Sequence, residues 1–377
     1  MRIAQIAPLW ESVPPKLYGG TERVVSYITE ELVRQGHDVT LFASGDSQTM
    51  ARLWAACPHS FRLERGLVNR DAPLLLMQEQ ALGIEAARFD VIHSHLDFLS
   101  FPLSRRCRTP VLTTLHGRLD LPELVSIFRE YADMPVVSIS EAQRIPLPHA
   151  NWQGTVYHGL PDLYPFHPNA GSYLAYLGRI CPEKRPDHAI EIAKRAGIPL
   201  RMAAKVDPLD RTYFETQIAP LLDHPLVEYM GEITDAEKRD FLGNAAAVLC
   251  PYDWPEPFGI VLIEALACGT PVLAYRRGSI PEIIEDGVTG FICENLEEMV
   301  TAIDRLPLIR REQCRNSFEV RFTVKRMVHD YLALYERMAA AVRPMVHVNG
   351  RSSTRPDHRR TPVTEHVIPH IPHIGTA

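Results

Sequence analysis

Short apolar runs alternate with amphipathic segments along most of the 377-residue chain. The apolar runs fall at residues 2–9, 37–44, 90–95, 110–117, 135–140 and 154–160 in the first half, and at 173–180, 200–205, 227–233, 247–252, 271–276 and 290–294 in the second. Between the first two runs, apolar residues recur at helical spacing and predict a helix from Thr21 to about Gln35, ended by Gly36. This alternation is typical of parallel sheets covered by helices. The sequence therefore predicts an α/β fold made of two doubly wound units.

The junction between the two units is predicted at residues 160–172, a segment rich in proline, glycine and asparagine that has no apolar period. We accordingly expect an N-terminal domain over residues 1–165 and a C-terminal domain over 166–343. Residues 317–342 predict one long helix that packs across both domains. After Pro344 the polar residues are scattered without period, so residues 344–377 are predicted to be a disordered tail.

Composition and charge narrow the classes of function. The net charge of −6 provides no basic footprint for nucleic acid or for an anionic membrane, and Arg105, Arg106 and Arg108 are interpreted as a solvated helix end. The seven cysteines are an odd number without metal-ligand spacing, which favours core filling in a reducing, cytoplasmic setting. The first ten residues predict a strand and not a signal peptide, and no apolar run is long enough to span a bilayer.

The most informative chemistry is a single charge in an apolar helix. Glu264 is the only charged residue between Phe258 and Tyr275. A helix that is apolar on every side is normally buried, and an ionised carboxylate within it needs hydrogen-bond donors. No lysine or arginine lies within one helical turn of Glu264. The donors must therefore come from elsewhere in the fold or from the hydroxyl groups of a ligand.

The loop that enters this helix carries a second carboxylate, Glu256, eight residues before Glu264. If the helix begins near Gly259, its free N–H groups and positive dipole end favour a phosphate, and Glu264 lies roughly 8 Å further along the axis. These dimensions suit a nucleotide diphosphate sugar, with the sugar at Glu256, the phosphates at the helix start and the ribose at Glu264.

Other candidate residues lie in loops at predicted strand ends, where ligands of parallel sheets bind. Gly19 and Gly20 directly precede a helix and allow close approach of a phosphate or sugar, although a glycine pair is more often just a turn. Their spacing matches neither a dinucleotide fingerprint nor a P-loop. His116 is predicted either to face a cleft or to be a core histidine bonded to the backbone. Arg179 and Lys184 flank a loop and suit a diphosphate, unless that loop is simply exposed and basic.

Three further histidines, His93, His95 and His158, also end predicted strands, and we interpret them as core residues. Asp97, Arg118 and Asp120 follow strand ends as well. At these positions they could touch an acceptor, but solvated loop charges are more common.

Four segments together resemble a known family. They read GGTERVVSYITEELVRQGHDVTLFAS at residues 19–44, LGRICPEKRPD at 177–187, EPFGIVLIEALACGTPVLA at 256–274 and GSIPEIIEDGVTGFI at 278–292. These segments resemble the GT-B glycosyltransferases, specifically family 4 of the retaining, nucleotide-sugar-dependent enzymes, over about residues 1–340. The resemblance implies two Rossmann-like domains, with the donor bound mainly by the C-terminal one and the acceptor mainly by the N-terminal one.

The resemblance also implies roles for individual residues. Arg179 and Lys184 would hold the diphosphate, Glu256 the hydroxyl groups of the donor sugar, and Glu264 the ribose. The remaining positions that meet the sugar and the phosphates would be the backbone of Phe258, Gly259, Ile260 and Val261, Gly20 from the opposite domain, and His116 near the anomeric carbon. Members of the family in general need no bound metal, so no cofactor is expected. One departure is His158, which stands where many relatives have asparagine.

The predicted reaction is transfer of a hexosyl unit from a UDP- or GDP-sugar to an acceptor hydroxyl with retention at the anomeric carbon. The residues nominate no carboxylate nucleophile, so we expect a front-face route in which the departing diphosphate takes the acceptor proton. The alternatives are a nucleotide-sugar epimerase or hydrolase of the same fold, and a non-catalytic nucleotide-sugar binding protein. The acceptor cannot be deduced from the sequence, because fold-level analogy does not supply one.

Overall fold

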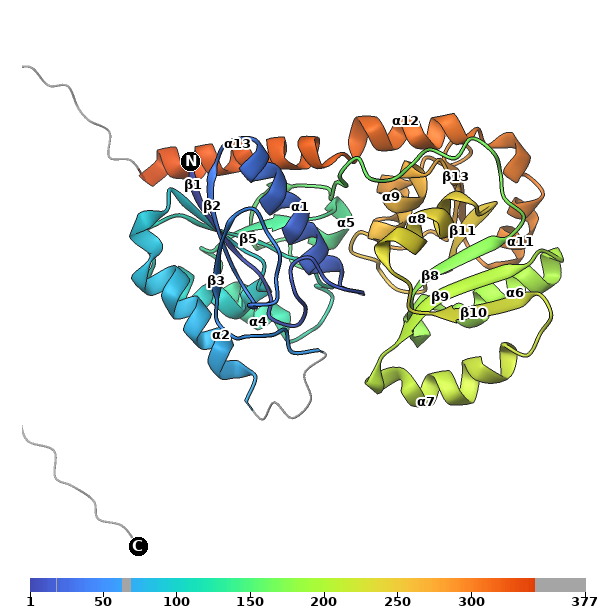
Figure 1. Cartoon of the computed structure of the whole chain (residues 1–377), viewed down its shortest axis with the longest axis horizontal. Helices are drawn as coiled ribbons and strands as arrows, with labels where there is room; N and C mark the ends of the chain where they lie inside the picture. Colours follow the sequence, from blue (N-terminus) through green and yellow to red (C-terminus); the bar gives the residue numbers. More distant parts are fainter. Residues whose placement is uncertain (18, 63–68, 343–377) are drawn as a thin grey trace, which may run out of the picture. The chain divides into compact units, whose positions relative to one another are not determined.

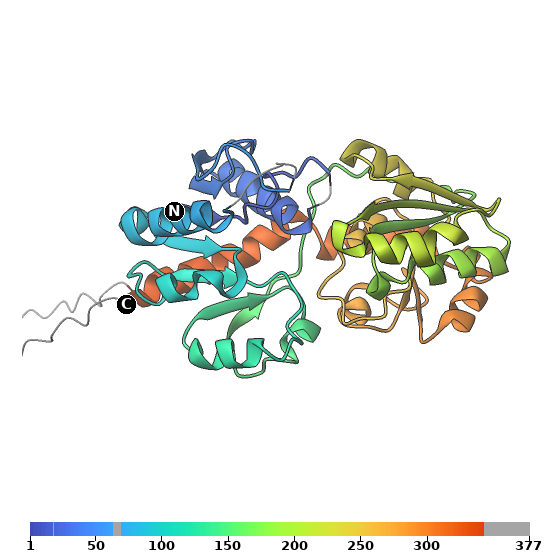
Figure 2. The same ribbon diagram turned by 90° about the horizontal axis from the view of Figure 1, so that it is seen from below.

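The computed structural model describes residues 1–17, 19–62 and 69–342, and the predicted disordered tail, residues 344–377, lies outside these described residues. Residues 1–342 form one compact unit. The described residues form two parallel sheets with helices on their faces (Figures 1 and 2). The predicted α/β, doubly wound fold class is therefore confirmed. The boundaries at residues 165 and 343 stay a prediction.

The first sheet has seven strands in the order β3-β2-β1-β4-β5-β6-β7. Its strands are β1 (Arg2–Ile6), β2 (Asp38–Ala43), β3 (Arg52–Ala55), β4 (Val91–Ser94), β5 (Val111–Thr114), β6 (Pro135–Ser138) and β7 (Asn151–Thr155). β3 was not predicted. The strand predicted at residues 154–160 overlaps β7 only at residues 154 and 155. The helices of this half are α1 (Gly20–Arg34), α2 (Asp71–Gln78), α3 (Phe101–Ser104), α4 (Leu124–Glu130) and α5 (Glu141–Arg144). The predicted helix after the glycine pair is confirmed as α1.

The second sheet has six strands in the order β10-β9-β8-β11-β12-β13. Its strands are β8 (Leu174–Ile180), β9 (Leu200–Val206), β10 (Val227–Gly231), β11 (Ala247–Cys250), β12 (Val272–Tyr275) and β13 (Gly290–Cys293). The helices of this half are α6 (Pro186–Ala196), α7 (Arg211–Tyr213), α8 (Asp235–Gly243), α9 (Ile260–Ala267), α10 (Ile280–Ile283), α11 (Leu296–Ile303) and α12 (Arg311–Arg321), and α13 (Val324–Val342) follows. All six strands predicted for this half are present.

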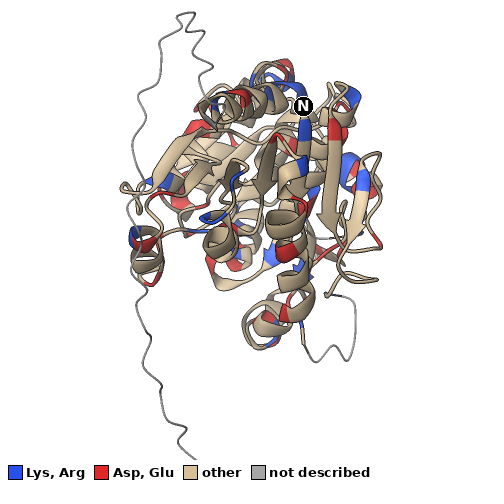
Figure 3. Cartoon of the chain, turned by 90° about the vertical axis from the view of Figure 1, so that its left-hand side faces the viewer, with Lys and Arg blue, Asp and Glu red and all other residues tan. Residues whose placement is uncertain are grey.

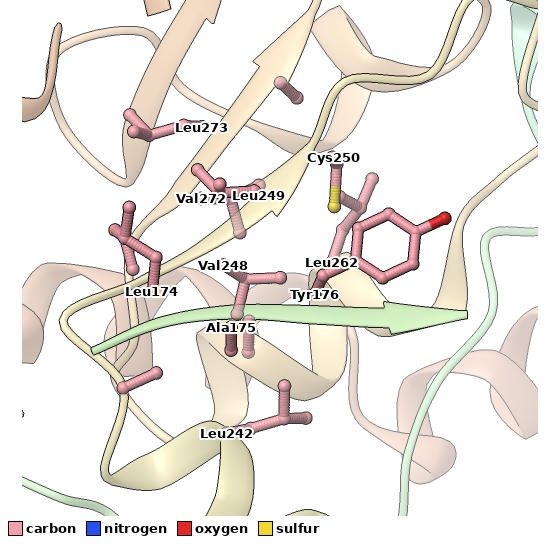
Figure 4. Packing of buried hydrophobic residues seen from close by; sticks show 14 of the residues in the cluster. Leu174, Ala175, Tyr176, Leu242, Val248, Leu249, Cys250, Leu262, Val272 and Leu273 are labelled. Atoms are coloured by element: carbon pink, nitrogen blue, oxygen red, sulfur yellow. The ribbon is translucent and has the colours of Figure 1, made fainter. Parts of the chain in front are cut away.

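The core of the second sheet explains its continuous apolar runs. All four residues of β11 are buried, as expected for a central strand covered on both faces. Val248 lies beside Ala175 and Val272 of the neighbouring strands, and Leu242 of α8 and Leu262 of α9 belong to the same cluster (Figure 4). Burial of this kind contributes about 1.5–3 kcal/mol per large side chain. It holds the helix that carries Glu264 firmly against the strands.

The predicted single helix over residues 317–342 is wrong, because the structure divides it into α12 and α13. Phe322 leaves the helical conformation, with φ of −130° and ψ of 26°. The backbone of Leu160 bonds to the residues on either side of Thr323. Its N–H donates to the Phe322 carbonyl at 2.8 Å, and its carbonyl accepts from the Val324 N–H at 2.8 Å. The helix therefore breaks to satisfy the backbone of the segment that joins the two sheets.

The two helices pack on different sheets. Val328, Tyr331 and Tyr335 of α13 belong to a cluster with Ile3 and Val24 of the first sheet's layers. α12 instead contacts α9. Figure 1 shows α13 lying along the first sheet, so the C-terminal helices cover elements of both halves.

Cysteines and charges are distributed as the composition suggested. Six of the seven cysteines are buried and Cys107 is half-buried, which confirms core filling. Lys and Arg are interspersed with Asp and Glu over the face shown in Figure 3. Arg105 pairs with Glu130 and Asp133. None of the helices in the described part of the chain combines the length and the apolar character needed to cross a bilayer.

Candidate functional site

A cavity of about 770 Å³ lies at the carboxyl ends of strands from both sheets. All eleven candidate site residues line it. They are Gly19, Gly20, His116, Arg179, Lys184, Glu256, Phe258, Gly259, Ile260, Val261 and Glu264. The parallel topology explains this convergence, because loops that follow parallel strands emerge at the same edge of a sheet. The structure thus places the candidates together, while their roles remain predictions.

The start of α9 forms one wall of the cavity. Gly259 caps the helix in the left-handed conformation, with φ of 79°. A side chain there would be strained, and its Cβ would lie 3.0 Å from Leu262 Cδ1. Across the cavity a Cβ on Gly20 would come 3.5 Å from Ile260 Cδ1. The N–H groups at the start of α9 therefore lie beside two glycines, in the arrangement that suits a phosphate.

Glu264 is buried in α9, with 3% of its surface exposed, and the predicted need for hydrogen-bond donors is confirmed. The donors are protein groups: the Lys238 ammonium and the Tyr164 hydroxyl, the latter at 2.8 Å. Burial lowers the pKa of Lys238, but Glu264, Asp235 and Tyr27 together outweigh this effect, and the pKa is raised. Burial and the same carboxylate raise the pKa of Tyr164. A ribose is therefore not required to explain why Glu264 can be buried.

Both of these bonds are made to one oxygen of the carboxylate, Oε1. Glu264 nevertheless lines the cavity, as does Lys238. Lys238 comes from α8 and is also 3.1 Å from Asp235. The carboxylate is thus held in a fixed orientation by side chains from other elements, with its second oxygen available to a ligand.

Glu256 and Lys184, predicted to hold the sugar and the diphosphate, form an ion pair with each other. The Trp254 indole N–H donates to Glu256 Oε2 at 3.0 Å. The Lys184 ammonium also lies 3.8 Å from the centre of the Tyr252 ring. The two predicted ligand residues are therefore coupled, and aromatic rings fix the position of the pair.

Arg179 is paired with two acidic residues, one in the loop after β8 and one in the segment after β9. Its Nη2 donates to Glu183 Oε1 at 2.8 Å, and its Nε lies 3.4 Å from Asp210 Oδ2. About a third of the side chain is exposed, 35%. Exposed ion pairs contribute about 0–1 kcal/mol, so an anionic ligand could replace these partners at little cost. Lys205 on β9 also lines the cavity and pairs with Asp207 at 3.0 Å.

His116 faces the cavity from the loop after β5. Its Nε2 lies 2.9 Å from His95 Nδ1, and its backbone N–H donates to Asp97 Oδ1 at 3.1 Å. Burial lowers the pKa of His116 to about 3, so the imidazole is neutral near pH 7. Burial also raises the pKa of Asp97 to about 6. His116 can therefore accept or donate a hydrogen bond but supplies no positive charge.

The other strand-end histidines are buried, as expected, but their partners are not the expected backbone groups. His93 bonds to Thr114 and Tyr335, and His95 bonds to Gln5 and His116. His158 stacks on His116, with ring centres 5.4 Å apart, and lines the cavity. The departure from asparagine at this position thus places an aromatic ring between His116 and Phe258, whose ring lies 4.7 Å from His158.

The loop charges considered for an acceptor adjoin residues that line the cavity: Asp97 bonds to the His116 backbone, and the Arg118 guanidinium lies 5.7 Å from the centre of the Trp254 ring. Arg118 and Asp120 pair with each other at 2.7 Å. Neither they nor Asp97 are among the residues that line the cavity. Arg118 and Asp120 therefore fit the interpretation as solvated loop charges, whereas Asp97 does not, because it is half-buried and accepts a hydrogen bond from the His116 backbone.

Several cavity residues were missed. Trp10, Glu22, Arg23, Lys238 and Trp254 all line the site. The sequence held a signal for Trp254 only, since it stands two residues before Glu256 in the same loop. Arg23 pairs with Asp235, and neither residue has a local pattern that marks it.

Two family models match the chain. The model described as Glycosyl transferases group 1 matches residues 166–319, which contain β8 to β13, and the model described as Glycosyltransferase Family 4 matches residues 18–144, which contain α1 and β2 to β6. Both sheets are therefore represented in the matches, and so are most of the loops that line the cavity.

Individual proteins are similar over most of the chain. N-acetyl-alpha-D-glucosaminyl L-malate synthase of Bacillus anthracis is 25% identical over 362 residues, which span 84% of this chain and 93% of that protein. The structure of AviGT4, a glycosyltransferase involved in avilamycin A biosynthesis, covers 90% of this chain and 98% of its own, with a TM-score of 0.66 and 23% identity. The Anabaena HepE structure, in complex with UDP and glucose, covers 89% and 99%, with a TM-score of 0.69 and 18% identity. At these identities, the likeness to solved structures shows the fold alone.

Proposed function

The chain belongs to the glycosyltransferases with the GT-B fold, and from that membership we propose that it transfers a hexosyl unit from a UDP- or GDP-linked sugar to an acceptor hydroxyl with retention at the anomeric carbon. One observation carries the proposal. The start of α9, Lys184 and Glu264 line the same cavity, so groups suited to phosphate, leaving-group charge and ribose are present together. The likeness to HepE, solved with UDP and glucose, supports a nucleotide-linked donor.

The diphosphate is proposed to lie between the α9 N-terminus and the side chains of Arg179 and Lys184. These groups would stabilise the negative charge that develops as the glycosidic bond breaks. We propose that they serve without a metal ion, so that activity persists in EDTA. The ribose would donate a hydroxyl hydrogen bond to Glu264 Oε2, because both protein donors use Oε1.

The chemical step is proposed to follow a front-face route. The bond between the anomeric carbon and the diphosphate oxygen breaks, the acceptor oxygen bonds to the same face, and the acceptor proton passes to a diphosphate oxygen. In this proposal Glu256 binds the hydroxyl groups of the donor sugar and is not a nucleophile, and Lys184 and Trp254 hold its carboxylate in position through Oε2. Positioning and charge stabilisation then supply the catalysis.

The test begins with a thermal-shift panel of UDP, GDP, ADP and their sugars. A selective shift identifies the nucleotide, and the matching sugar is then offered with acceptors. Lys184→Ala and Arg179→Ala should each lower kcat/KM by roughly 10–100-fold, the value of a charge-assisted hydrogen bond of about 1.5–3 kcal/mol.

Arg276→Ala is the matched control. Arg276 is also half-exposed and paired with a glutamate, Glu294, but it does not line the cavity. Turnover that survives both cavity substitutions would refute the phosphate assignment. Release of nucleoside diphosphate without any acceptor would instead identify a hydrolase, and saturable binding without turnover would identify a binding protein.

A further inference from the structure

A continuous chain of buried hydrogen bonds connects α13 to the cavity. Its groups, in order, are Tyr331, Thr114, His93, Tyr335, Gln5, His95 and His116, joined by six hydrogen bonds of 2.6–3.2 Å. Every member before His116 is at most 1% exposed. The residues come from β1, β4, β5 and α13 and the loops that follow the strands. Such a network is costly to leave half satisfied, so its donors and acceptors must be consistent along its whole length.

Gln5 sets the donor-to-acceptor direction of this hydrogen-bond network. Its amide N–H donates to the Tyr335 hydroxyl at 3.2 Å, and its carbonyl Oε1 lies 2.9 Å from His95 Nε2. An amide oxygen only accepts, so His95 Nε2 must carry the hydrogen. Burial and the neighbouring histidines lower the pKa of His95 well below its ordinary value, so the ring is neutral and its Nδ1 is a bare acceptor.

The same reasoning continues to His116. Because His95 Nδ1 accepts, His116 Nε2 must donate to it across 2.9 Å. The neutral His116 ring then has no hydrogen on Nδ1. This Nδ1 is buried and has no hydrogen-bond partner among the described residues. It belongs to a side chain that lines the cavity, so a ligand in the cavity is the candidate partner that the described residues do not supply.

We propose that Gln5, His95 and Tyr335 are positioning residues that fix the Nε2–H tautomer of His116 and so hold its Nδ1 as an acceptor for a substrate hydroxyl group. This inference rests on the proposed function for the identity of the substrate as a hydroxyl-bearing sugar or acceptor. The opposite donor-to-acceptor direction of the hydrogen bonds would require the Gln5 amide to be turned by 180° and would make His116 Nδ1 a donor. The two orders therefore predict opposite chemistry at one atom.

The direct test is the tautomer itself, measured by NMR on the full chain with ¹⁵N-labelled histidine near pH 7. His116 should show a protonated Nε2 and an unprotonated, pyridine-like Nδ1. In Gln5→Met, which keeps the size of the side chain but removes the amide, and in Tyr335→Phe, this signal should become a mixture of tautomers. A hydrogen on Nδ1 in the native chain, or a tautomer that neither substitution changes, overturns the proposal.

The kinetic test asks whether the tautomer matters. Tyr335→Phe should lower kcat about tenfold, the value of one hydrogen bond, with the donor KM nearly unchanged. Tyr331→Phe is the matched control, because it removes another fully buried hydroxyl of α13, at the end of the hydrogen-bond network that is farthest from His116. Equal losses in the two variants would show a structural effect and refute the positioning role. The NMR measurement needs no substrate, so the tautomer assignment can be judged even if no transfer reaction is found.

Discussion

Glu22 is a carboxylate in the first turn of α1 that lines the cavity with only 6% of its surface exposed. Burial raises its pKa from 4.5 to about 7. Between these values the folded protein keeps a proton that the unfolded chain releases, so the free energy of unfolding falls as the pH rises through this window. The loss is complete above pH 7 and amounts to about 3 kcal/mol.

Glu22→Gln should remove this pH dependence. The variant is expected to be more stable than the native chain at pH 8 and nearly as stable at pH 4.5, because only the ionised form is disfavoured. Urea unfolding at the two pH values measures the difference. Glu215→Gln, at an exposed position, should change neither value. Equal stability of native and Glu22→Gln proteins at pH 8 would show that Glu22 ionises without cost.

Two substitutions of Glu264 distinguish its contribution to stability from its contribution to ligand binding. Glu264→Ala leaves Lys238 buried without its main partner, and breaking a buried pair costs up to about 3–5 kcal/mol. Glu264→Gln keeps the shape and an acceptor for Tyr164, so it should fold with a smaller loss. If the ribose uses this carboxylate, Glu264→Gln should weaken nucleotide binding about tenfold by calorimetry. Unchanged affinity would contradict the ribose assignment.

Single residues also mark the limit of what the sequence could predict at the site. An apolar helix shows that Glu264 needs a donor, but Lys238 lies 26 positions earlier along the chain and has no pattern that links the two. The pairing of Lys184 with Glu256 is equally non-local, across 72 positions. The sequence could predict that the eleven candidate residues meet at one cavity, because strand ends converge, although it missed others that line it, such as Arg23 and Lys238. It could not predict which of them neutralise one another, because that depends on the packed side chains.

At the scale of elements, the break between α12 and α13 is the feature that local patterns could not predict. Residues 321–324 contain neither glycine nor proline, so their pattern continues the helix. The break comes from pairing with Leu160, which is remote in sequence. β3 was missed for a related reason, since it has only four residues, none of them buried. Strands of equal length such as β4, β5 and β11 were predictable because all of their residues are buried in apolar runs.

Gly159 makes the backbone pairing at this break possible. A Cβ on Gly159 would lie 2.3 Å from the Thr323 carbonyl oxygen, a backbone atom that cannot turn aside. Gly159→Ala should therefore destabilise the protein by about 1–3 kcal/mol, as other overpacked sites do. Gly178→Ala, whose added Cβ would meet nothing within 4 Å, is the control. Equal unfolding midpoints in urea for these two variants would contradict the proposed role of the Leu160–Thr323 contact.

At the scale of the whole molecule, a few polar contacts connect elements of the two sheets around the cavity. Glu282 of α10 accepts hydrogen bonds from the backbone N–H groups of Glu141 and Ala142, at 2.8 and 2.7 Å, and from the Tyr157 hydroxyl at 2.9 Å. One carboxylate of the second half thus binds the start of α5 in the first half. The cavity needs residues from both halves, so this contact bears on its shape.

Glu282→Ala should therefore affect catalysis more than its local bonds would suggest. The matched control is Glu285→Ala, three residues away. Glu285 also accepts two side-chain bonds, from Ser317 and Arg321 at 2.9 Å each, but within the second half only. Each substitution should cost about 1–2 kcal/mol in thermal unfolding, since each removes hydrogen bonds to a charged group that is partly exposed. Only Glu282→Ala should also lower kcat/KM, by about tenfold, because the two walls of the cavity are then held less firmly in register. If both variants lost stability and activity in the same proportion, the Glu282 contact would only stabilise the fold and would not align donor and acceptor.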